Sequence, residues 1–255
     1  MITRAHITRR ASRDGVPART VERDYVLAHV VAAVGALGSE SRLVFKGGTA
    51  LRLCHVQDYR YSADLDFPIV GGSLEDGLDD VTRALGSSGG SVEGLRLTHD
   101  RPPRIAYTGP LGRERMLKLD LVDDELVLHT EDRALLPQWP DLPRDVTVRV
   151  YSMLEIAGEK LRCVLQRLQC RDLFDLHLLF EALGVDAGEA AEVFRPKAEH
   201  RGFDPALLAT RYPERLEQYG KRWAQELAEH VPAEVPHFEI VARAVSRHLR
   251  RAGLR

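Results

Sequence analysis

Acidic side chains alternate along two apolar segments, and this spacing could bring carboxylates together. Asp64 and Asp66 lie in ADLDFPIV, which has the composition of a strand, so their side chains share one face. Asp120 lies in a second apolar segment, LKLDLV, where a carboxylate is costly unless something pairs with it. If the two strands are neighbours, three carboxylates meet, and Mg²⁺ is the cation that suits such oxygen ligands. The alternative for each acid is a solvated position at the edge or on the exposed face of a strand.

A glycine pair precedes these acids, between the short apolar strand LVF and the helical segment TALRLCHV. Gly47 and Gly48 would let the backbone approach an anion closely, with N–H groups and a helix N-terminus directed at it. Thr49 adds a hydroxyl donor. The turn could therefore cradle the phosphates of a nucleoside triphosphate, and the alternative is a turn with a structural role alone.

A lysine in the second half of the sequence could meet a phosphate. Lys160 lies in MLEIAGEKLRCVLQRL, whose apolar positions have helical spacing, so its stem can be buried while its ammonium reaches outward. Asp172 and Asp175 share a face of the next helix. One of them could orient Lys160 or Arg171 while the other caps the helix. The alternative is a solvated lysine on the surface.

The elements that must position these residues divide the sequence into two halves. Residues 20–150 combine strand-like segments with helices and predict an α/β domain, whereas residues 151–255 carry helical spacing throughout. Residues 1–19 are rich in arginine and predict a flexible basic arm. The stretch GSSGGSVEG, 86–94, predicts a flexible connector.

Composition limits the class of protein. The chain has 255 residues, of which 44% are hydrophobic and 29% charged, as in an ordinary soluble globular protein. Its net charge of −2 excludes a global basic field, so nucleic-acid binding would need a local patch. No apolar run is long enough to span a membrane. We therefore expect a cytoplasmic protein without membrane association, and small core residues at the three cysteines Cys54, Cys163 and Cys170.

In their joint order these motifs resemble the AbiEii/AbiGii toxin family, which comprises nucleotidyltransferase-fold toxins of type IV toxin–antitoxin systems and includes the mycobacterial MenT branch. The resemblance spans roughly residues 20–185 and is carried by FKGGTALRLCHVQDYRYSADLDF, KLDLV and MLEIAGEKLRCVLQRLQCRDLFDLHLL. The family's third motif usually carries an acid where Ala157 precedes Gly158 and Glu159, a change that leaves Lys160 undisturbed. The family motifs fall on Gly47, Gly48, Thr49, Arg60, Tyr61, Ser62, Asp64, Asp66, Phe67, Glu159, Lys160, Arg171, Asp172 and Asp175.

The resemblance implies an α/β (α+β) nucleotidyltransferase-fold domain with a mixed sheet, a C-terminal helical domain, and an active site in the cleft between them. The expected metal ligands for Mg²⁺ are Asp64, Asp66 and Asp120. Catalysis is expected to involve these three together with Lys160, Asp172 and Asp175. The residues expected to contact the nucleotide are Lys46, Gly47, Gly48, Thr49, Arg60, Ser62 and Lys160.

The resemblance also implies that a nucleotide from a nucleoside triphosphate is transferred to RNA, with the 3′ end of tRNA as the expected acceptor, and that translation is blocked. It implies a cognate antitoxin protein. The arginines beside the expected cleft, Arg162, Arg167 and Arg171, are the first candidates for RNA contacts, and Lys221, Arg222, Arg247, Arg250, Arg251 and Arg255 are weaker ones. Two alternatives remain open: a nucleotidyltransferase that modifies a protein or small molecule, and a non-catalytic nucleotide-binding regulator.

Overall fold

The chain folds into two compact units. The computed structural model describes residues 2–87, 92–98, 100–232 and 234–255, so part of the connector predicted over 86–94 lies outside the described residues. The main division falls after Tyr151, where the sequence predicts the change to helices. Unit 1 comprises Met1–Glu125, Thr130–Tyr151 and His230–Ala233, and unit 2 comprises Leu126–His129, Ser152–Glu229 and Glu234–Arg255.

Unit 1 is built around a four-stranded mixed sheet in the order β1-β4-β3-β2. β1 pairs parallel to β4, whereas β3 pairs antiparallel with both β4 and β2. The strands are β1 (Asp64–Pro68), β2 (Glu93–Leu97), β3 (Arg104–Thr108) and β4 (Glu114–Val122). A separate antiparallel pair joins β5 (Thr130–Ala134) to β6 (Thr147–Tyr151). The predicted strand LVF takes part only through isolated bridges at Leu43 and Phe45.

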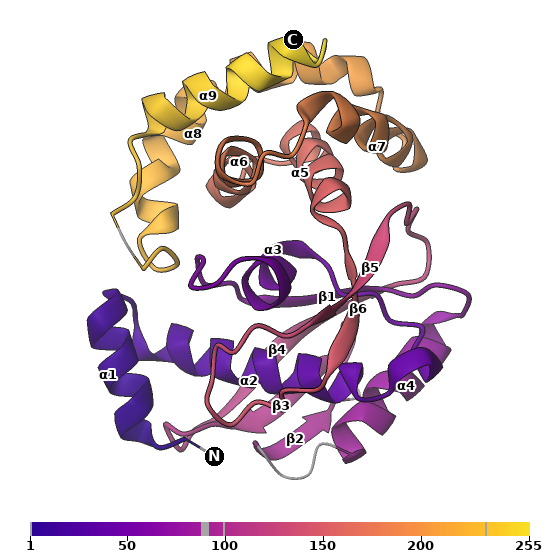
Figure 1. Cartoon of the computed structure of the whole chain (residues 1–255), viewed down its shortest axis with the longest axis vertical. Helices are drawn as coiled ribbons and strands as arrows, with labels where there is room; N and C mark the ends of the chain where they lie inside the picture. Colours follow the sequence, from indigo (N-terminus) through magenta and orange to yellow (C-terminus); the bar gives the residue numbers. More distant parts are fainter. Residues whose placement is uncertain (1, 88–91, 99, 233) are drawn as a thin grey trace. The chain divides into compact units, whose positions relative to one another are not determined.

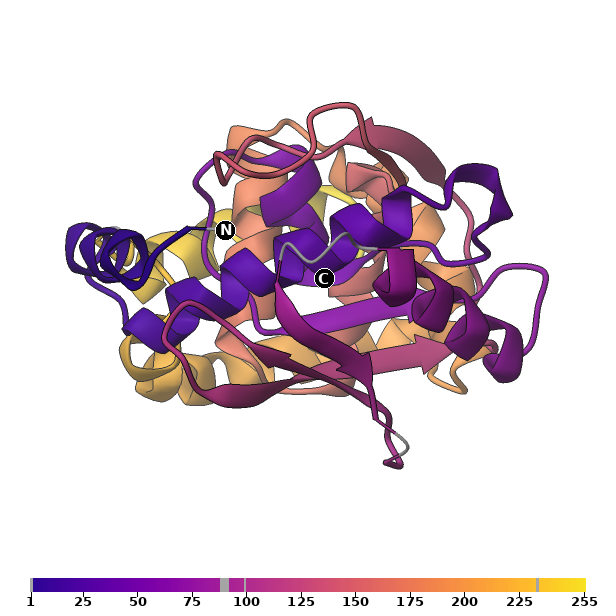
Figure 2. The same cartoon turned by 90° about the horizontal axis from the view of Figure 1, so that it is seen from below.

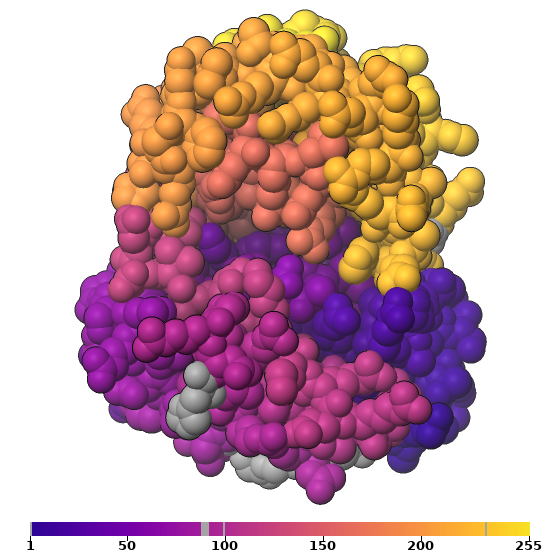
Figure 3. All heavy atoms as spheres, turned by 180° about the vertical axis from the view of Figure 1, so that it is seen from behind, coloured from indigo at the N-terminus to yellow at the C-terminus, as the bar shows by residue number. Residues whose placement is uncertain are grey.

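Alternation along β4 gives the sheet two different faces. Leu117 and Leu119 are buried, whereas Lys118 between them is exposed. The helices α2 (Ala18–Gly35) and α4 (Leu74–Ser87) pack against each other on the apolar side (Figures 1 and 2), and α4 contacts β2 and β4. Seen from behind, residues from the middle of the sequence, coloured magenta to pink, form part of the surface of unit 1 (Figure 3). Lys118 and Asp120 alternate with these leucines and lie on the opposite face of the sheet, which is the polar one.

The first residues form a helix, which differs from the flexible arm that the sequence predicts. α1 spans Arg4–Asp14, and its apolar side chains Ile7 and Ala11 are buried. Arg10 fixes the helix further, because its Nη1 donates to the Gln138 carbonyl oxygen at 2.7 Å. The arginine-rich segment is therefore docked by two apolar side chains one helical turn apart and by the contacts of Arg10.

Three short helical turns follow α2 in unit 1. The turn that carries the glycine pair is α3 (Gly47–Ala50), which continues into the π-helical turn η2 (Leu51–His55). A 3₁₀ turn, η1 (Gly38–Glu40), follows α2. The run of apolar residues predicted in α2 is buried from Tyr25 onward, which explains why this helix is apolar on nearly all sides.

Unit 2 is a helical assembly around α5. The Ser152 hydroxyl caps α5 by accepting from the Glu155 N–H at 3.1 Å. α5 contacts α6, α7 and α8, and its buried Ile156, Leu161 and Leu165 supply the apolar face for them. The elements are α5 (Met153–Gln166), α6 (Cys170–His177), η3 (Leu178–Ala182), α7 (Ala187–His200), η4 (Pro205–Leu207), α8 (Leu208–Leu227) and α9 (Phe238–Arg251). Among the described residues, no helix has the length and apolar character needed to cross a membrane.

Candidate active site

The predicted carboxylates lie side by side on the polar face of the sheet in unit 1. In the parallel pairing of β1 with β4, Asp66 is opposite Asp120 and Asp64 is opposite Lys118. Because paired residues of neighbouring strands share a face, all four side chains project to the same side. The sequence alone did not determine whether the strands that carry Asp64, Asp66 and Asp120 are neighbours. The structure shows that they are.

The charges on this face are poorly balanced. Burial raises the pKa of Asp66 to about 6; Lys46 opposes the shift, and the charges of Asp64 and Asp120 add to it. A raised pKa means that the negative charge of this carboxyl group is destabilised by burial and by its acidic neighbours. Additional positive charge near it would therefore be stabilising. The site is thus suited to a cationic ligand.

Lys118 is a member of this site that sequence reasoning missed. Its Nζ donates to the Asp120 carboxylate, and this hydrogen bond raises the pKa of Lys118. The signal was present in LKLDLV, since the alternation that exposes Asp120 places Lys118 on the same face. Lys118 supplies part of the positive charge that the three acids require.

The donor chemistry of the site fits Mg²⁺ in part. Across the residues that the structure describes, no group of three or more His, Cys, Asp or Glu side chains is arranged to hold a metal ion. With Asp120 held by Lys118, the face offers the carboxylates of Asp64 and Asp66, which is the kind of limited protein ligand set that Mg²⁺ uses together with phosphate oxygens. The raised pKa of Asp66 agrees with a need for such a cation.

The glycine pair brings the backbone against these acids. Gly47 has φ +81°, and a Cβ added there would lie 2.9 Å from Asp66 Oδ2. A Cβ at Gly48 would collide with the guanidinium of Arg60. The N–H of Lys46 donates to the Asp66 carbonyl oxygen at 3.1 Å, so the turn is fixed to β1. The pair is therefore required by the close approach of this turn to the carboxylate and to Arg60.

The other residues predicted to contact a nucleotide in unit 1 make internal contacts. Thr49 Oγ1 donates to the Asp64 carbonyl oxygen at 2.6 Å, and Lys46 Nζ lies 2.7 Å from Glu125 Oε2. Arg60 and Ser62 are buried, with 2% and 7% of their surfaces exposed. Thr49 thus supports the backbone of β1, and a direct contact with nucleotide stays a prediction for all four residues.

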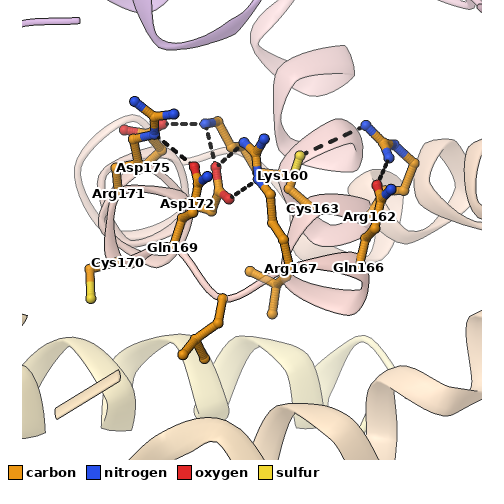
Figure 4. Close-up of polar contacts among 12 residues, drawn as sticks. Lys160, Arg162, Cys163, Gln166, Arg167, Gln169, Cys170, Arg171, Asp172 and Asp175 are labelled. Atoms are coloured by element: carbon orange, nitrogen blue, oxygen red, sulfur yellow. Dashed lines mark hydrogen bonds and ion pairs between the residues drawn. The ribbon is translucent and has the colours of Figure 1, made fainter. Parts of the chain in front are cut away.

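A second polar cluster lies within unit 2, between α5 and α6 (Figure 4). Lys160 Nζ lies 2.8 Å from Asp172 Oδ1 and 2.7 Å from Asp175 Oδ2, and all three side chains are buried. The structure differs from the prediction that one aspartate orients the lysine while the other caps the helix. Both aspartates bind the ammonium, and the N-cap residue of α6 is Gln169, which makes no side-chain cap.

The charges in this second cluster are matched. Burial by itself would raise the pKa of Asp172, but Lys160 and Arg167 outweigh it and hold the pKa below its ordinary value. Arg167 Nε donates to Asp172 Oδ2 at 2.8 Å. Two cations and two carboxylates thus neutralise one another inside unit 2.

The arginines predicted to contact RNA are each engaged within unit 2. Arg162 Nη2 lies 2.5 Å from Glu159 Oε1, and Arg171 Nε donates to Gln169 Oε1 at 2.9 Å. Arg167 keeps 42% of its side chain exposed. Among the weaker candidates, ion pairs hold Lys221, Arg222 and Arg247. RNA contact stays a prediction for all of them.

The structure also shows a buried ion pair that the sequence did not reveal. Lys197 of α7 is 2% exposed and lies 2.6 Å from Glu155 Oε1. Glu155 accepts in addition from the His129 N–H at 3.0 Å. Nothing in the spacing of AEVFRPKAEH distinguishes Lys197 from a solvated lysine, so its partner could be found only from the packing of α5 against α7.

Comparisons with known proteins were made at the level of sequence and of structure. The sequence model of the family described as "Nucleotidyl transferase AbiEii toxin, Type IV TA system" matches residues 30–245. No curated protein matches the sequence. MenT4, a nucleotidyltransferase toxin from Mycobacterium tuberculosis H37Rv, is similar in structure with a TM-score of 0.68 and 19% identity, covering 100% of this chain and 89% of that one.

A second solved structure is similar over nearly the same extent. A putative nucleotidyltransferase from H. pylori has a TM-score of 0.55 and 17% identity, and the alignment covers 93% of this chain and 96% of that one. At these identities the two structures establish a shared fold. That fold is the mixed α/β architecture that the sequence predicts.

Proposed function

Because this chain belongs to the AbiEii family of nucleotidyl transferase toxins of type IV toxin–antitoxin systems, we propose that it transfers a nucleotide from a nucleoside triphosphate to an RNA acceptor. The 3′ end of tRNA is the acceptor that we expect, and blocked translation is the consequence. The observation that carries the proposal is the placement of three carboxylates, Asp64, Asp66 and Asp120, on one face of the sheet beside the glycine turn.

In the proposed reaction, the acceptor hydroxyl oxygen attacks the α-phosphorus of the nucleoside triphosphate. The bond from that phosphorus to the bridging oxygen breaks, and pyrophosphate leaves. Asp120 takes the proton of the hydroxyl once its carboxylate is released from Lys118. The ammonium of Lys118 is then available to the phosphate charge that develops during transfer.

Asp64 and Asp66 are the residues that would hold Mg²⁺. When bound, this ion supplies charge neutralisation and polarises the phosphoryl oxygens. The turn at Gly47 contributes close backbone packing beside Asp66, which keeps this carboxylate in one position. Positioning and electrostatics together, with no covalent intermediate on the protein, would supply most of the catalysis.

A transfer assay tests the proposal. The full chain is incubated with Mg²⁺, total cellular RNA and each α-labelled nucleoside triphosphate in turn, and the products are separated on a denaturing gel. We expect label in RNA of tRNA length, with pyrophosphate released in equal amount and no labelling in EDTA. Label in protein or in a small molecule, with all RNA unlabelled, would contradict the RNA acceptor. No transfer to any acceptor would contradict the enzymatic function.

The family also implies a protein partner. We propose that a cognate antitoxin restrains this chain in the cell, as the type IV toxin–antitoxin description of its family indicates. Co-expression with the antitoxin encoded beside it should restore growth that the chain alone suppresses. The Asp66→Asn variant, expressed alone at the same level, is the control and should not suppress growth.

A further inference from the structure

One face of α1 carries a row formed by a histidine and three arginines. His6, Arg9, Arg10 and Arg13 follow the spacing at which residues share a side of a helix. Arg4 lies on the opposite side of the same helix. The basic segment that the sequence predicts as a flexible arm therefore presents its charge in one fixed direction.

This row lines a pocket of about 280 Å³ in unit 1. The side chains of Trp139 and Pro140, from the segment that follows β5, give the pocket an apolar part. No carboxylate is among its lining residues, which are Ile2, His6, Arg9, Arg10, Arg13, Gln138, Trp139 and Pro140. A pocket with a cationic wall and an apolar floor suits an anion that is attached to a flat or apolar group.

Arg10, in the cationic wall of the pocket, is held by several contacts with the rest of unit 1. The guanidinium of Arg10 lies 4.3 Å from the centre of the Trp139 ring and donates to the Gln138 carbonyl oxygen at 2.7 Å. Its Nε also donates to the Tyr61 hydroxyl at 3.2 Å. Tyr61 belongs to the segment RYSADLDF, so α1 is joined directly to the stretch of chain that leads into Asp64.

The positive charge of the wall is only partly neutralised. Asp14 lies 2.6 Å from Arg13 and 3.6 Å from Arg10, so one carboxylate serves two guanidinium groups. Asp58 lies 3.6 Å from Arg10 as well. Arg9 is exposed and makes no hydrogen bond or ion pair within the described part of the chain. Arg9 therefore brings an uncompensated charge to the pocket.

We propose that this pocket binds a phosphate of the RNA acceptor together with its attached sugar or base. The inference rests on the proposed function, because an RNA substrate is what brings a phosphate backbone to unit 1. Neutralising a phosphate by arginine releases counterions, and the apolar floor at Trp139 and Pro140 can pack against the nucleoside part. The pocket would hold the RNA while its end is extended at the carboxylates of the same unit.

Charge reversal at Arg9 tests the proposal. Arg9→Glu should weaken binding of fluorescently labelled total tRNA about tenfold in an anisotropy titration, and should lower the slope of log K against log[salt] by about one. Arg4→Glu is the matched control, since it makes the same change on the opposite side of α1 and should leave both quantities unchanged. Both variants should melt at the wild-type temperature and bind nucleoside triphosphate normally, because neither residue supports the core or the carboxylates.

The outcomes separate this inference from the proposed function. If wild-type protein labels RNA while Arg9→Glu and Arg4→Glu bind tRNA equally well, the pocket does not hold RNA and the proposed function stands. If wild-type protein neither binds nor labels RNA, the proposed function fails and this inference fails with it. If poly-glutamate binds the wild type more tightly than tRNA does, and Arg9→Glu abolishes that binding, the occupant is an acidic protein and the RNA assignment is wrong.

Discussion

The polar clusters at the sheet of unit 1 and between α5 and α6 of unit 2 differ in how their charges are balanced. In unit 1, three carboxylates share one sheet face, and the pKa of Asp66 rises to about 6. In unit 2, Lys160 and Arg167 neutralise Asp172 and Asp175, and the pKa of Asp172 falls. The pKa of Asp66 is raised mainly by burial, with the charges of Asp64 and Asp120 adding to the shift, whereas the pKa of Asp172 is lowered because Lys160 and Arg167 outweigh burial. We infer that the first is built for a ligand and that the second is largely preassembled.

The largest expected effect separates activity from stability in unit 1. Asp66→Asn and Asp64→Asn should each lower the rate of nucleotide transfer by about a hundredfold to a thousandfold. Their melting temperatures should stay within a few degrees of the wild type, because the removal of one crowded carboxylate relieves repulsion. Asp79→Asn, an exposed acid of α4, is the control and should keep full activity. Normal transfer by either site variant would remove the carboxylates from the mechanism.

The opposite pattern is expected in unit 2. Lys160→Met leaves two buried carboxylates without their shared cation, so the free energy of unfolding should fall by about 3–5 kcal/mol in a urea titration. Lys221→Met is the control. It removes an exposed lysine that pairs with Glu217, and it should change stability by less than about 1 kcal/mol.

Because Lys160→Met also destabilises the protein, its transfer rate must be divided by the fraction of protein that is folded. If Lys160 acts on the triphosphate, as the sequence predicts, Lys160→Met should lower the rate per folded molecule about a hundredfold or more. The folded fraction is measured in the same buffer by circular dichroism. A normal rate per folded molecule would mean that Lys160 serves only to hold α5 against α6.

A smaller effect is expected at the glycine turn. Gly47→Ala and Gly71→Ala both place a side chain at positive φ, +81° and +74°, so both should lose about 1–2 kcal/mol. Only at Gly47 does the new Cβ approach the Asp66 carboxylate, whereas at Gly71 it meets nothing within 4 Å. Transfer should therefore fall in Gly47→Ala and persist in Gly71→Ala. Equal activity in the two variants would show that the turn does not position Asp66.

The smallest expected effect concerns the arginines of unit 2. Arg167→Gln should cost about 1 kcal/mol of stability, since Lys160 still neutralises Asp172 and the arginine is substantially exposed. We expect a smaller change in tRNA affinity than Arg9→Glu produces, because the charge of Arg167 is already matched within the fold. A larger loss in Arg167→Gln would support the sequence prediction that these arginines contact RNA.

The sequence predicted the elements better than it predicted the partners of each side chain. α5 and α9 were predicted because amphipathic spacing requires a buried apolar face, and β1 and β4 because their apolar residues alternate or run on at strand length. β5 was missed because TEDRA is mostly polar and charged, and its strand conformation comes from pairing with β6. α1 was predicted as a flexible arm because two buried residues, Ile7 and Ala11, decide its docking among many arginines.

Side-chain partners depend on register and packing, which a single sequence does not contain. The alternation of LKLDLV places Lys118 and Asp120 on one face, but only the parallel pairing with β1 sets Asp66 opposite Asp120. The arginines near α5 were predicted to contact RNA because they cluster beside the expected cleft. Their carboxylate and amide partners become visible only once the helices are folded.

The central claim is that the carboxylates of unit 1 bind a metal ion together with the nucleotide, whereas the carboxylates of unit 2 bind only the cations of their own cluster. A calorimetric titration with Mn²⁺, as a substitute for Mg²⁺, tests it on three proteins in the presence of a non-hydrolysable nucleoside triphosphate. We predict saturable binding to the wild type and to Asp175→Asn, and loss of that binding in Asp66→Asn. Equal binding to Asp66→Asn and the wild type, or loss of binding in Asp175→Asn alone, would contradict the claim.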